Sequence, residues 1–415
     1  MAIVEHAESS ASIATLPIED IDVSDPRLYQ DDVWQPVFAR LRREAPVHYC
    51  RQSRYGPYWS ITRYHEIMAV EVDHATFSSQ LGGIQVEDQP RGQERPSFIR
   101  MDPPRHTEQR RTVAPVAAPT NLAHYETLIR ERTQHVLEEL PRNAVFNWVD
   151  LVSIELTGLM LATLFDFPLA ERRKLTYWSD VAIANVYSAD APVHSEDERF
   201  EELKRMGAYF MELRDARSKE PPKLDLISMM VHSPATHEMP PMEFIGNLAL
   251  LIVGGNDTTR NSMSGGLLAL SENPEQWEKL RARPELVPSL VAETIRYQTP
   301  VIHMRRTATR DVEFRGQQIK KGDKVVMWYV SGNRDETAID DPDAFIIDRA
   351  KPRQHLSYGA GIHRCVGDRL ADLQLRILWE EILRRDLDIE VMGPPRRLYS
   401  NFIRGIRELP VRINA

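Results

Sequence analysis

Residues 358–367 place one cysteine in a setting that favours negative charge. The run reads Tyr-Gly-Ala-Gly-Ile-His-Arg-Cys-Val-Gly, and its three glycines allow a tight backbone path around Cys365. A helical pattern begins at Asp368, and the free N–H groups and the dipole at such a helix start favour an anion. His363 and Arg364 add positive charge. The sequence therefore predicts a thiolate at Cys365.

A lone thiolate serves as a nucleophile, as a redox sensor or as a metal ligand. The second cysteine, Cys50, is far away in sequence, so we expect neither a disulfide framework nor a zinc or iron–sulfur site with several cysteines. A nucleophile needs a histidine partner, which spacing alone does not identify. A haem iron needs one protein ligand on its proximal side. A buried cysteine that packs as a small apolar residue is the structural alternative.

The composition excludes several other classes of function. The 415 residues are 42% apolar and 27% charged, as in ordinary globular proteins. A net charge of -9 argues against a nucleic-acid partner. No apolar run approaches the roughly 18 residues of a membrane span, and the N-terminus lacks a signal-peptide pattern. We therefore expect a soluble, cytoplasmic protein without a transmembrane segment.

Charge is distributed unevenly along the chain. Residues 1–36 hold eight acidic side chains and one basic one, which predicts a flexible acidic arm over residues 1–27 and a single domain over residues 28–415. Residues 349–415 hold thirteen Lys and Arg against eight Asp and Glu, a net of +5. Such a basic segment favours either an acidic partner or a solvated basic surface.

Helical periodicity dominates the remaining sequence, which predicts a mainly α protein with small β-sheets. The expected helices span residues 125–140, 151–165, 196–219, 242–271, 286–297 and 368–385. The expected strands span residues 58–61, 312–314 and 324–330. Two loops, at residues 79–96 and 188–195, are candidate lids because long loops in compact domains are often functional.

The cysteine run resembles the haem-ligand loop of the cytochrome P450 superfamily, whose pattern is Phe-x-x-Gly-x-(His/Arg)-x-Cys-x-Gly. Tyr358 replaces the phenylalanine, and we expect its hydroxyl, near the sulfur, to tune the potential of the iron. The resemblance implies the cytochrome P450 fold, in which haem b lies between a long distal helix and the helix that follows the cysteine loop. It also implies that Cys365 is the axial ligand of the iron.

Other residues match the family at expected positions. Glu293 and Arg296 form the Glu-x-x-Arg pair, which by resemblance joins Arg349 to lock the core behind the haem. The resemblance also assigns a group of basic residues to the two haem propionates. These residues are His106, Arg110, Arg306 and His363.

Residues 250–259 read as the distal helix, although Gly254 and Gly255 are poor helix formers at its centre. Glycine lets a flat ligand approach the backbone, and a threonine hydroxyl can bond a main-chain carbonyl and open a local bulge. By resemblance, Thr258 donates a hydrogen bond to dioxygen and Asp257 relays protons from solvent. Asn256 stands where many relatives have an apolar residue.

Runs at residues 254–262, 328–336, 373–383 and 400–405 narrow the resemblance to bacterial P450s that hydroxylate the terminal carbon of medium-chain alkanes and fatty acids. A terminal C–H bond is stronger than an internal one, so a narrow apolar channel must impose attack at the chain end. We expect its walls to include Leu250, Val253, Val301, Ile302, Phe402 and residues 84–86.

The resemblance further implies electron delivery by an acidic ferredoxin that is served by an NADH-dependent reductase. Arg364 and Arg369, beside the cysteine, are the predicted contacts, and we expect a monomer. Two other functions stay open. One is a P450 that hydroxylates a terpene or another bulky lipid, and the other is a haem-thiolate ligand sensor without turnover. The Asp257–Thr258 pair argues against the sensor, because a binding module needs no proton relay.

Overall fold

The structure is a computed structural model that describes residues 16–89, 92 and 95–414. About half of these residues are helical, in agreement with the mainly α protein that the periodicity predicts. The helices are α2 Pro26–Gln30, α3 Gln35–Glu44, α4 Tyr64–Val72, α5 Arg105–Val113, α6 Pro119–Glu138, α7 Ile154–Leu164, α8 Arg173–Ile183, α9 Glu196–Arg217, α10 Leu226–His232, α11 Pro241–Glu272, α12 Pro274–Ala282, α13 Val287–Gln298, α14 Tyr329–Gly332 and α15 Asp368–Arg384.

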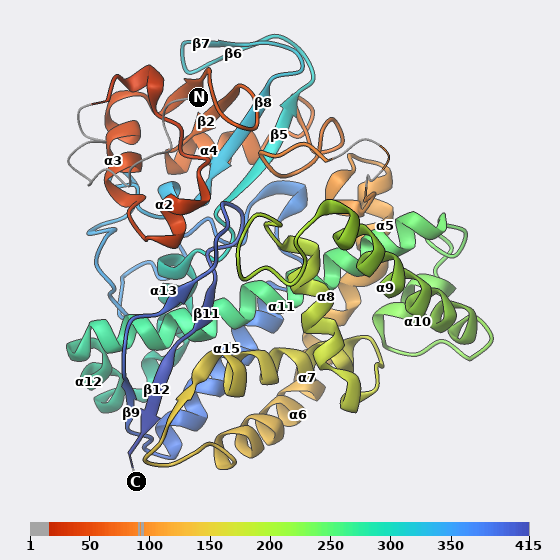
Figure 1. Cartoon of the computed structure of the whole chain (residues 1–415), viewed down its shortest axis with the longest axis vertical. Coiled ribbons are helices and arrows are strands. Elements are labelled where there is room, and N and C mark those ends of the chain that lie inside the picture. Colours follow the sequence, from red (N-terminus) through yellow and green to blue (C-terminus); the bar gives the residue numbers. More distant parts are fainter. Residues whose placement is uncertain (1–15, 90–91, 93–94, 415) are drawn as a thin grey trace.

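The strands are short and form small sheets. They are β1 Val47–Cys50, β2 Tyr58–Ile61, β3 Phe77–Ser78, β4 Val145–Asn147, β5 His303–Ala308, β6 Val312–Phe314, β7 Gln317–Ile319, β8 Lys324–Trp328, β9 Ile389–Val391, β10 Arg396–Arg397, β11 Ile406–Glu408 and β12 Pro410–Ile413. The largest sheet has the order β1-β2-β8-β5-β3, and only its β2–β8 pair is parallel. This sheet lies at one end of the molecule, beside α3 and α4, and the rest is mainly helical, with β9, β11 and β12 at the lower left (Figure 1).

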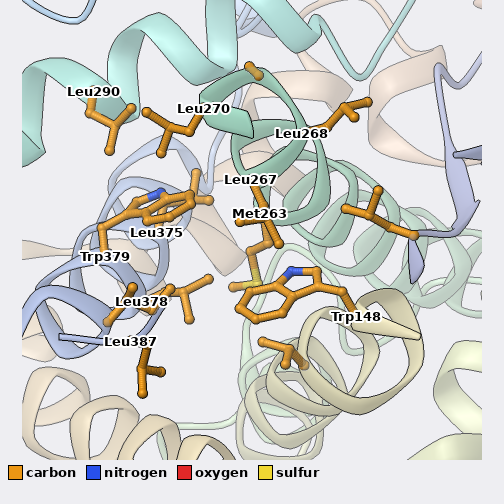
Figure 2. Close-up of a cluster of buried hydrophobic side chains, with 14 of the residues drawn as sticks. Trp148, Met263, Leu267, Leu268, Leu270, Leu290, Leu375, Leu378, Trp379 and Leu387 are labelled. Carbon is orange, nitrogen blue, oxygen red and sulfur yellow. The ribbon is translucent and has the colours of Figure 1, made fainter. Parts of the chain in front are cut away.

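Helix α11 runs through the middle of the helical part and packs against α7, α8, α13 and α15 (Figure 1). Small residues on α11 permit this close packing. A Cβ at Gly265, for example, would lie 2.3 Å from Oε1 of Gln298 on α13. Figure 2 shows the resulting core, in which Met263 and Leu267 of α11 lie between Trp148 and Trp379. The burial of α11 on several sides explains why its apolar pattern is so long.

The structure confirms the expected helices within a few residues and reproduces two of the expected strands, β2 and β6, residue for residue. The third, β8, ends at Trp328 instead of Val330, because the chain turns there into α14. The shorter helices, such as α3, α5 and α12, were not predicted from periodicity. Within the described residues, no helix combines the length and the apolarity needed to cross a membrane.

The predicted flexible arm is wrong for residues 16–27. Ile21 and Val23 are buried in an apolar cluster that also contains Trp34 and Trp328. Polar contacts hold the same segment, because the Tyr58 hydroxyl donates to Oδ1 of Asp22 at 2.7 Å. The high acidic content of this segment favoured the prediction of a solvated arm, although apolar residues lie between the acidic ones. Residues 1–15 of the predicted arm lie outside the described residues.

Candidate functional site

A cavity of about 300 Å³ lies between the middle of α11 and the start of α15, and Cys365 forms part of its wall. Most lining residues are apolar. They come from α7, the end of α8, α11, the loop at residues 95–100, the segment at residues 300–304 and Phe402 and Ile403. The fold therefore places an apolar cavity beside Cys365, the cysteine that the sequence analysis identified.

A tight loop positions Cys365 at the edge of this cavity. Its N–H donates to the carbonyl of Tyr358 at 2.7 Å, and its side chain is open to the cavity. Gly361 has a φ of +61°, and a Cβ there would lie 2.6 Å from the carbonyl oxygen of Glu71 on α4. A glycine is therefore required at this position both by backbone conformation and by space.

Burial raises the pKa of the Cys365 thiol to about 11. The Gly367 N–H and the guanidinium groups of Arg110 and Arg364 act in the opposite direction but do not outweigh burial. The predicted basic neighbours are thus present, but by themselves they do not hold a thiolate at neutral pH. A thiol that coordinates a metal is deprotonated by that metal, so the raised pKa is compatible with the predicted metal ligand.

The Tyr358 hydroxyl is hydrogen-bonded away from the sulfur but lies near enough to interact with its charge, so its effect on the potential of the iron stays a prediction. The hydroxyl donates to Oδ1 of Asp372 at 2.7 Å and lies 3.2 Å from the carbonyl oxygen of Asp368, so it is directed toward α15. The ring still packs at the cavity wall. The extra oxygen of tyrosine therefore anchors the loop to the helix.

The four basic residues predicted to hold the propionates gather on one side of the cavity. The rings of His106 and His363 lie 4.3 Å apart between centroids, and Arg110, Arg306 and His363 line the cavity wall. Arg306 donates to Oε2 of Glu71 at 3.0 Å, and Arg110 donates to the carbonyl of Arg364 at 2.5 Å. Positive charge thus exceeds negative charge here.

The histidines of this group lack partners that an anion would supply. Both ring nitrogens of His106 and Nδ1 of His363 are buried without a hydrogen-bond partner among the described residues. Burial, reinforced by Arg110, lowers the pKa of His106 to about 4, and burial with Arg306 lowers that of His363 to about 2. A buried group of donors and cations without enough acid fits a ligand that carries two carboxylates, as haem does.

On the opposite side of the cavity, Thr258 faces inward from α11. Its hydroxyl donates to the carbonyl of Gly254 at 2.7 Å, as the sequence predicts. The expected bulge is absent, because α11 is continuous from Pro241 to Glu272. Gly254, Gly255 and Thr258 together form the cavity wall at this level.

Asp257 does not line the cavity. Adjacent helical residues point about 100° apart, so Asp257 faces α8 when Thr258 faces the cavity. It accepts hydrogen bonds from Ser179 and from Arg260, and Arg260 also donates to Oδ1 of Asp180 at 2.5 Å. Burial raises the pKa of Asp257, although Arg260 opposes the shift. Because Asp180 is half-exposed, these groups connect the buried carboxyl toward the surface.

Asn256, whose role the sequence left open, ties α11 to α7. It is fully buried, and its Oδ1 accepts a hydrogen bond from Thr157 at 3.1 Å. Oγ1 of Thr157 also lies 2.9 Å from the carbonyl oxygen of Ser153, so the two acceptors share its one proton. Asn256 is therefore a packing contact and does not reach the cavity.

Four of the predicted substrate contacts, together with Ile84 and Gln85, line the cavity: Leu250, Val253, Val301 and Phe402. The predictions that Ile302 and Val86 contact the substrate are wrong, because both side chains are buried in the cluster around Trp328. Neighbouring residues of an extended chain point to opposite sides, so Ile302 faces away when Val301 faces the cavity.

Sequence reasoning missed several lining residues. Gly246 and Ala249 lie on the same face of α11 as Leu250 and Val253, so their helical spacing was an available signal. Others have no such signal, because they reach the cavity from distant elements: Phe98, Arg95, Arg100, Met160, Leu161, Leu164, Ala182, Ile183 and Met304.

The predicted lock behind the site is confirmed. Glu293 and Arg296 form a buried two-point ion pair at 2.7 and 2.8 Å, and Nε of Arg349 reaches both carboxylate oxygens of Glu293 at 3.0 Å. Arg296 also donates to the carbonyl of Asn333 at 2.8 Å, and Asn333 accepts from the N–H of Leu356 at 2.6 Å. The ion pairs thus connect to the segment that enters the cysteine loop.

Comparisons with known proteins identify this architecture. The cytochrome P450 family model matches residues 198–393. Linalool 8-monooxygenase of Pseudomonas putida is 36% identical over 407 residues, which are 95% of this chain and 99% of that protein. Methyl-branched lipid omega-hydroxylase of Mycobacterium bovis is 33% identical over 414 residues, which cover 95% of each chain. The structure of CYP153D17 from Sphingomonas sp. PAMC 26605 is 50% identical, with a TM-score of 0.90 over 96% of this chain and 100% of that chain.

These relatives confirm the resemblance to bacterial cytochromes P450, including terminal hydroxylases, that the motifs indicated. They also argue against a ligand sensor without turnover. The two relatives named above for an activity are oxygenases, and each match extends over nearly the whole chain. The chain therefore belongs to the cytochrome P450 family, as a monooxygenase whose cofactor is haem b.

Proposed function

We propose that this monooxygenase hydroxylates the terminal carbon of medium-chain alkanes or fatty acids, with dioxygen and with electrons from an acidic ferredoxin. The observation that carries the proposal is the cavity itself, whose walls are mostly apolar from α11 to Phe402 and which ends at Cys365. A long apolar chain gains free energy by burial in such a cavity, at about 25 cal/mol per Å². The terminal specificity follows from the walls, which must hold internal carbons away from the reacting site.

The residues predicted to bind the cofactor and to relay protons keep their roles in this proposal. Cys365 would bind the haem iron, and His106, Arg110, Arg306 and His363 would hold the propionates. When bound, haem b supplies the oxygen-activating chemistry. The chain contributes the ligand, the placement of the substrate and the supply of protons.

Proton supply is the task of Thr258 and Asp257. The Thr258 hydroxyl lines the cavity, and it can donate a hydrogen bond there once its single proton rotates away from the carbonyl of Gly254. Asp257 lies one residue away but faces Ser179, Arg260 and Asp180, which lead toward the protein surface. This arrangement supports a relay in which Asp257 exchanges protons with the surface side and Thr258 presents them to the cavity side.

A second candidate function is the hydroxylation of a terpene. It is supported by the 36% identity with linalool 8-monooxygenase, which spans 95% of this chain. Identity at this level does not determine the shape of a cavity, so the two candidates differ in their products and not in their fold.

Product analysis tests the proposal. The haem-loaded protein, supplied with a ferredoxin, its reductase and NADH, is offered octane, dodecanoic acid and linalool, and the hydroxylated positions are identified by mass spectrometry. We expect 1-octanol and 12-hydroxydodecanoic acid as the main products. Val301→Ala should increase hydroxylation at internal carbons, whereas the neighbouring Ile302→Val, which faces away from the cavity, should leave the ratio unchanged. Predominant linalool turnover, or internal products from the wild type, would exclude terminal chain hydroxylation.

A further inference from the structure

Two arginines of the cavity wall take no part in the group assigned to the propionates. Arg95 and Arg100 both line the cavity and flank the apolar residues Phe98 and Ile99 of the same loop. The charges that act on Arg100 come from Arg95 and Arg305, and not from the four basic residues of the propionate group. The cavity therefore has a second region of positive charge.

The cavity wall offers these arginines no ion pair among the described residues, although the carboxylates of Glu196 and Glu87 act on Arg95 from outside the wall. Among the described lining residues, Glu71 is the one carboxylate, and it is engaged by Arg306 and by the Tyr329 hydroxyl. Arg95 donates to the carbonyl of Ala182 at 3.2 Å, near the end of α8. Within the described part of the chain, Arg100 forms no ion pair, and its charged neighbours are also cations.

The backbone makes room for Arg100. Gly83, in the facing loop, has a φ of +91°, and a Cβ there would lie 2.5 Å from Nη1 of Arg100. Arg305, the other neighbouring cation, is paired with Asp88 at 2.6 Å, so its charge is balanced. Burial lowers the pKa of Arg100 to about 10, which still leaves it charged at neutral pH. A charged group that is partly buried without an acid is costly unless a ligand supplies one.

We propose that Arg100, assisted by Arg95, binds the carboxylate of a fatty acid and makes this enzyme selective for acids over alkanes of the same length. The inference rests on the proposed function and narrows its substrate class. A guanidinium can bind a carboxylate with two parallel hydrogen bonds, and such charge-assisted bonds are strong in a desolvated site. With the carboxylate held at this loop, the apolar chain would extend along the cavity, and its methyl end would be the part left to reach the Thr258 side of the haem.

The test compares dodecanoate with methyl dodecanoate, which has the same chain and no charge. Binding to the haem-loaded enzyme is measured by the low-to-high spin shift and, independently, by isothermal calorimetry. We expect wild type to bind the acid at least tenfold more tightly than the ester. Arg100→Leu should weaken acid binding by roughly 10- to 100-fold and leave ester binding within about twofold. Arg100→Lys should retain most of the preference.

Arg51→Leu is the matched control, because Arg51 is exposed and does not line the cavity. It should leave both affinities unchanged. Equal binding of acid and ester by wild type, or equal weakening of both in Arg100→Leu, would overturn the inference. The melting temperature of the ligand-free enzyme provides a second measurement. Arg100→Leu should not lower it, since no internal ion pair is lost. A lowered melting temperature with an intact preference for the acid would instead assign Arg100 to internal packing.

The role of Arg100 and the proposed terminal hydroxylation can fail independently of each other. The ratio of acid to ester affinity tests Arg100 whichever carbon is hydroxylated, whereas the position of the hydroxyl tests terminal attack whichever head group binds.

Discussion

The hydroxyl of Thr258 donates a 2.7 Å hydrogen bond to the carbonyl of Gly254, one helical turn earlier on the cavity wall of α11. This contact holds the hydroxyl oxygen at the cavity surface in a continuous helix. The oxygen is thereby presented to the site where proton delivery is proposed.

Thr258→Ala should keep haem and substrate binding but lose coupling. Product formed per NADH is expected to fall by roughly tenfold or more, with electrons released as hydrogen peroxide, because a positioned proton donor commonly contributes 10²- to 10⁴-fold to a step. Thr258→Ser, which retains the hydroxyl, should recover most of the coupling. Peroxide and product are measured together against NADH consumption. Full coupling in Thr258→Ala would remove this role.

The two cysteines should behave differently on substitution. Cys365→His should abolish the red-shifted Soret band of the reduced carbon monoxide complex, since the thiolate ligand is lost. Cys50→Ser should retain that band, because Cys50 is buried in β1 outside the cavity and burial raises its pKa to about 12. The measurement is the difference spectrum of each purified variant. Loss of haem from folded Cys50→Ser would contradict the assignment.

Ferredoxin docking should depend on Arg369 more than on Arg364. Both side chains are exposed, but Arg364 is paired with Asp368 at 2.7 Å, whereas no ion pair is found for Arg369 within the described residues. Arg369→Glu should slow reduction by ferredoxin roughly tenfold at low salt and leave the haem spectrum unchanged. Rising salt should slow wild-type reduction, because exposed charges are screened over about 8 Å at physiological ionic strength.

Lys219→Glu is the control for Arg369→Glu, because it makes the same change of charge at an exposed position beyond the end of α9. Its reduction rate should match that of wild type. A wild-type rate that does not vary with salt would exclude electrostatic docking. Reduction by a small chemical reductant should be the same in all three proteins.

Asp32 should make stability sensitive to acid. Although burial alone would raise its pKa, Arg404 and Arg397 lower it from 3.8 to about 2. A carboxylate with a lowered pKa stabilises the fold above pH 4, and this contribution is lost as the pH falls toward 2. The shift corresponds to roughly 2 kcal/mol at pH 7, since one unit is about 1.4 kcal/mol. Asp32→Asn should therefore lower the melting temperature at pH 7, and its deficit should shrink between pH 4 and pH 3.

Asp31→Asn removes a carboxylate from the adjacent exposed position and serves as the control. It should change the melting temperature little at either pH. A deficit of Asp32→Asn that stays constant from pH 7 to pH 3 would show that the ion pairs with Arg404 and Arg397 are not its cause.

The sequence by itself determined the parts of this protein that are encoded over a few consecutive residues. The cysteine loop, the Glu293–Arg296 pair and the strand at residues 58–61 each depend on local spacing, and the structure contains all three. Turn geometry, helical spacing and strand alternation act over one or two turns of chain, so the order of residues is sufficient to predict them.

Only the tertiary structure decided which way neighbouring side chains face and what they meet. Asp257 finds Ser179 and Asp180, about eighty positions earlier in the chain, because α8 packs across α11. Ile302 faces the Trp328 cluster while Val301 faces the cavity. Among the described residues, Arg100 meets cations and apolar side chains instead of an acid. Such contacts depend on the packing of distant elements, which is a property of the whole fold and not of any local pattern.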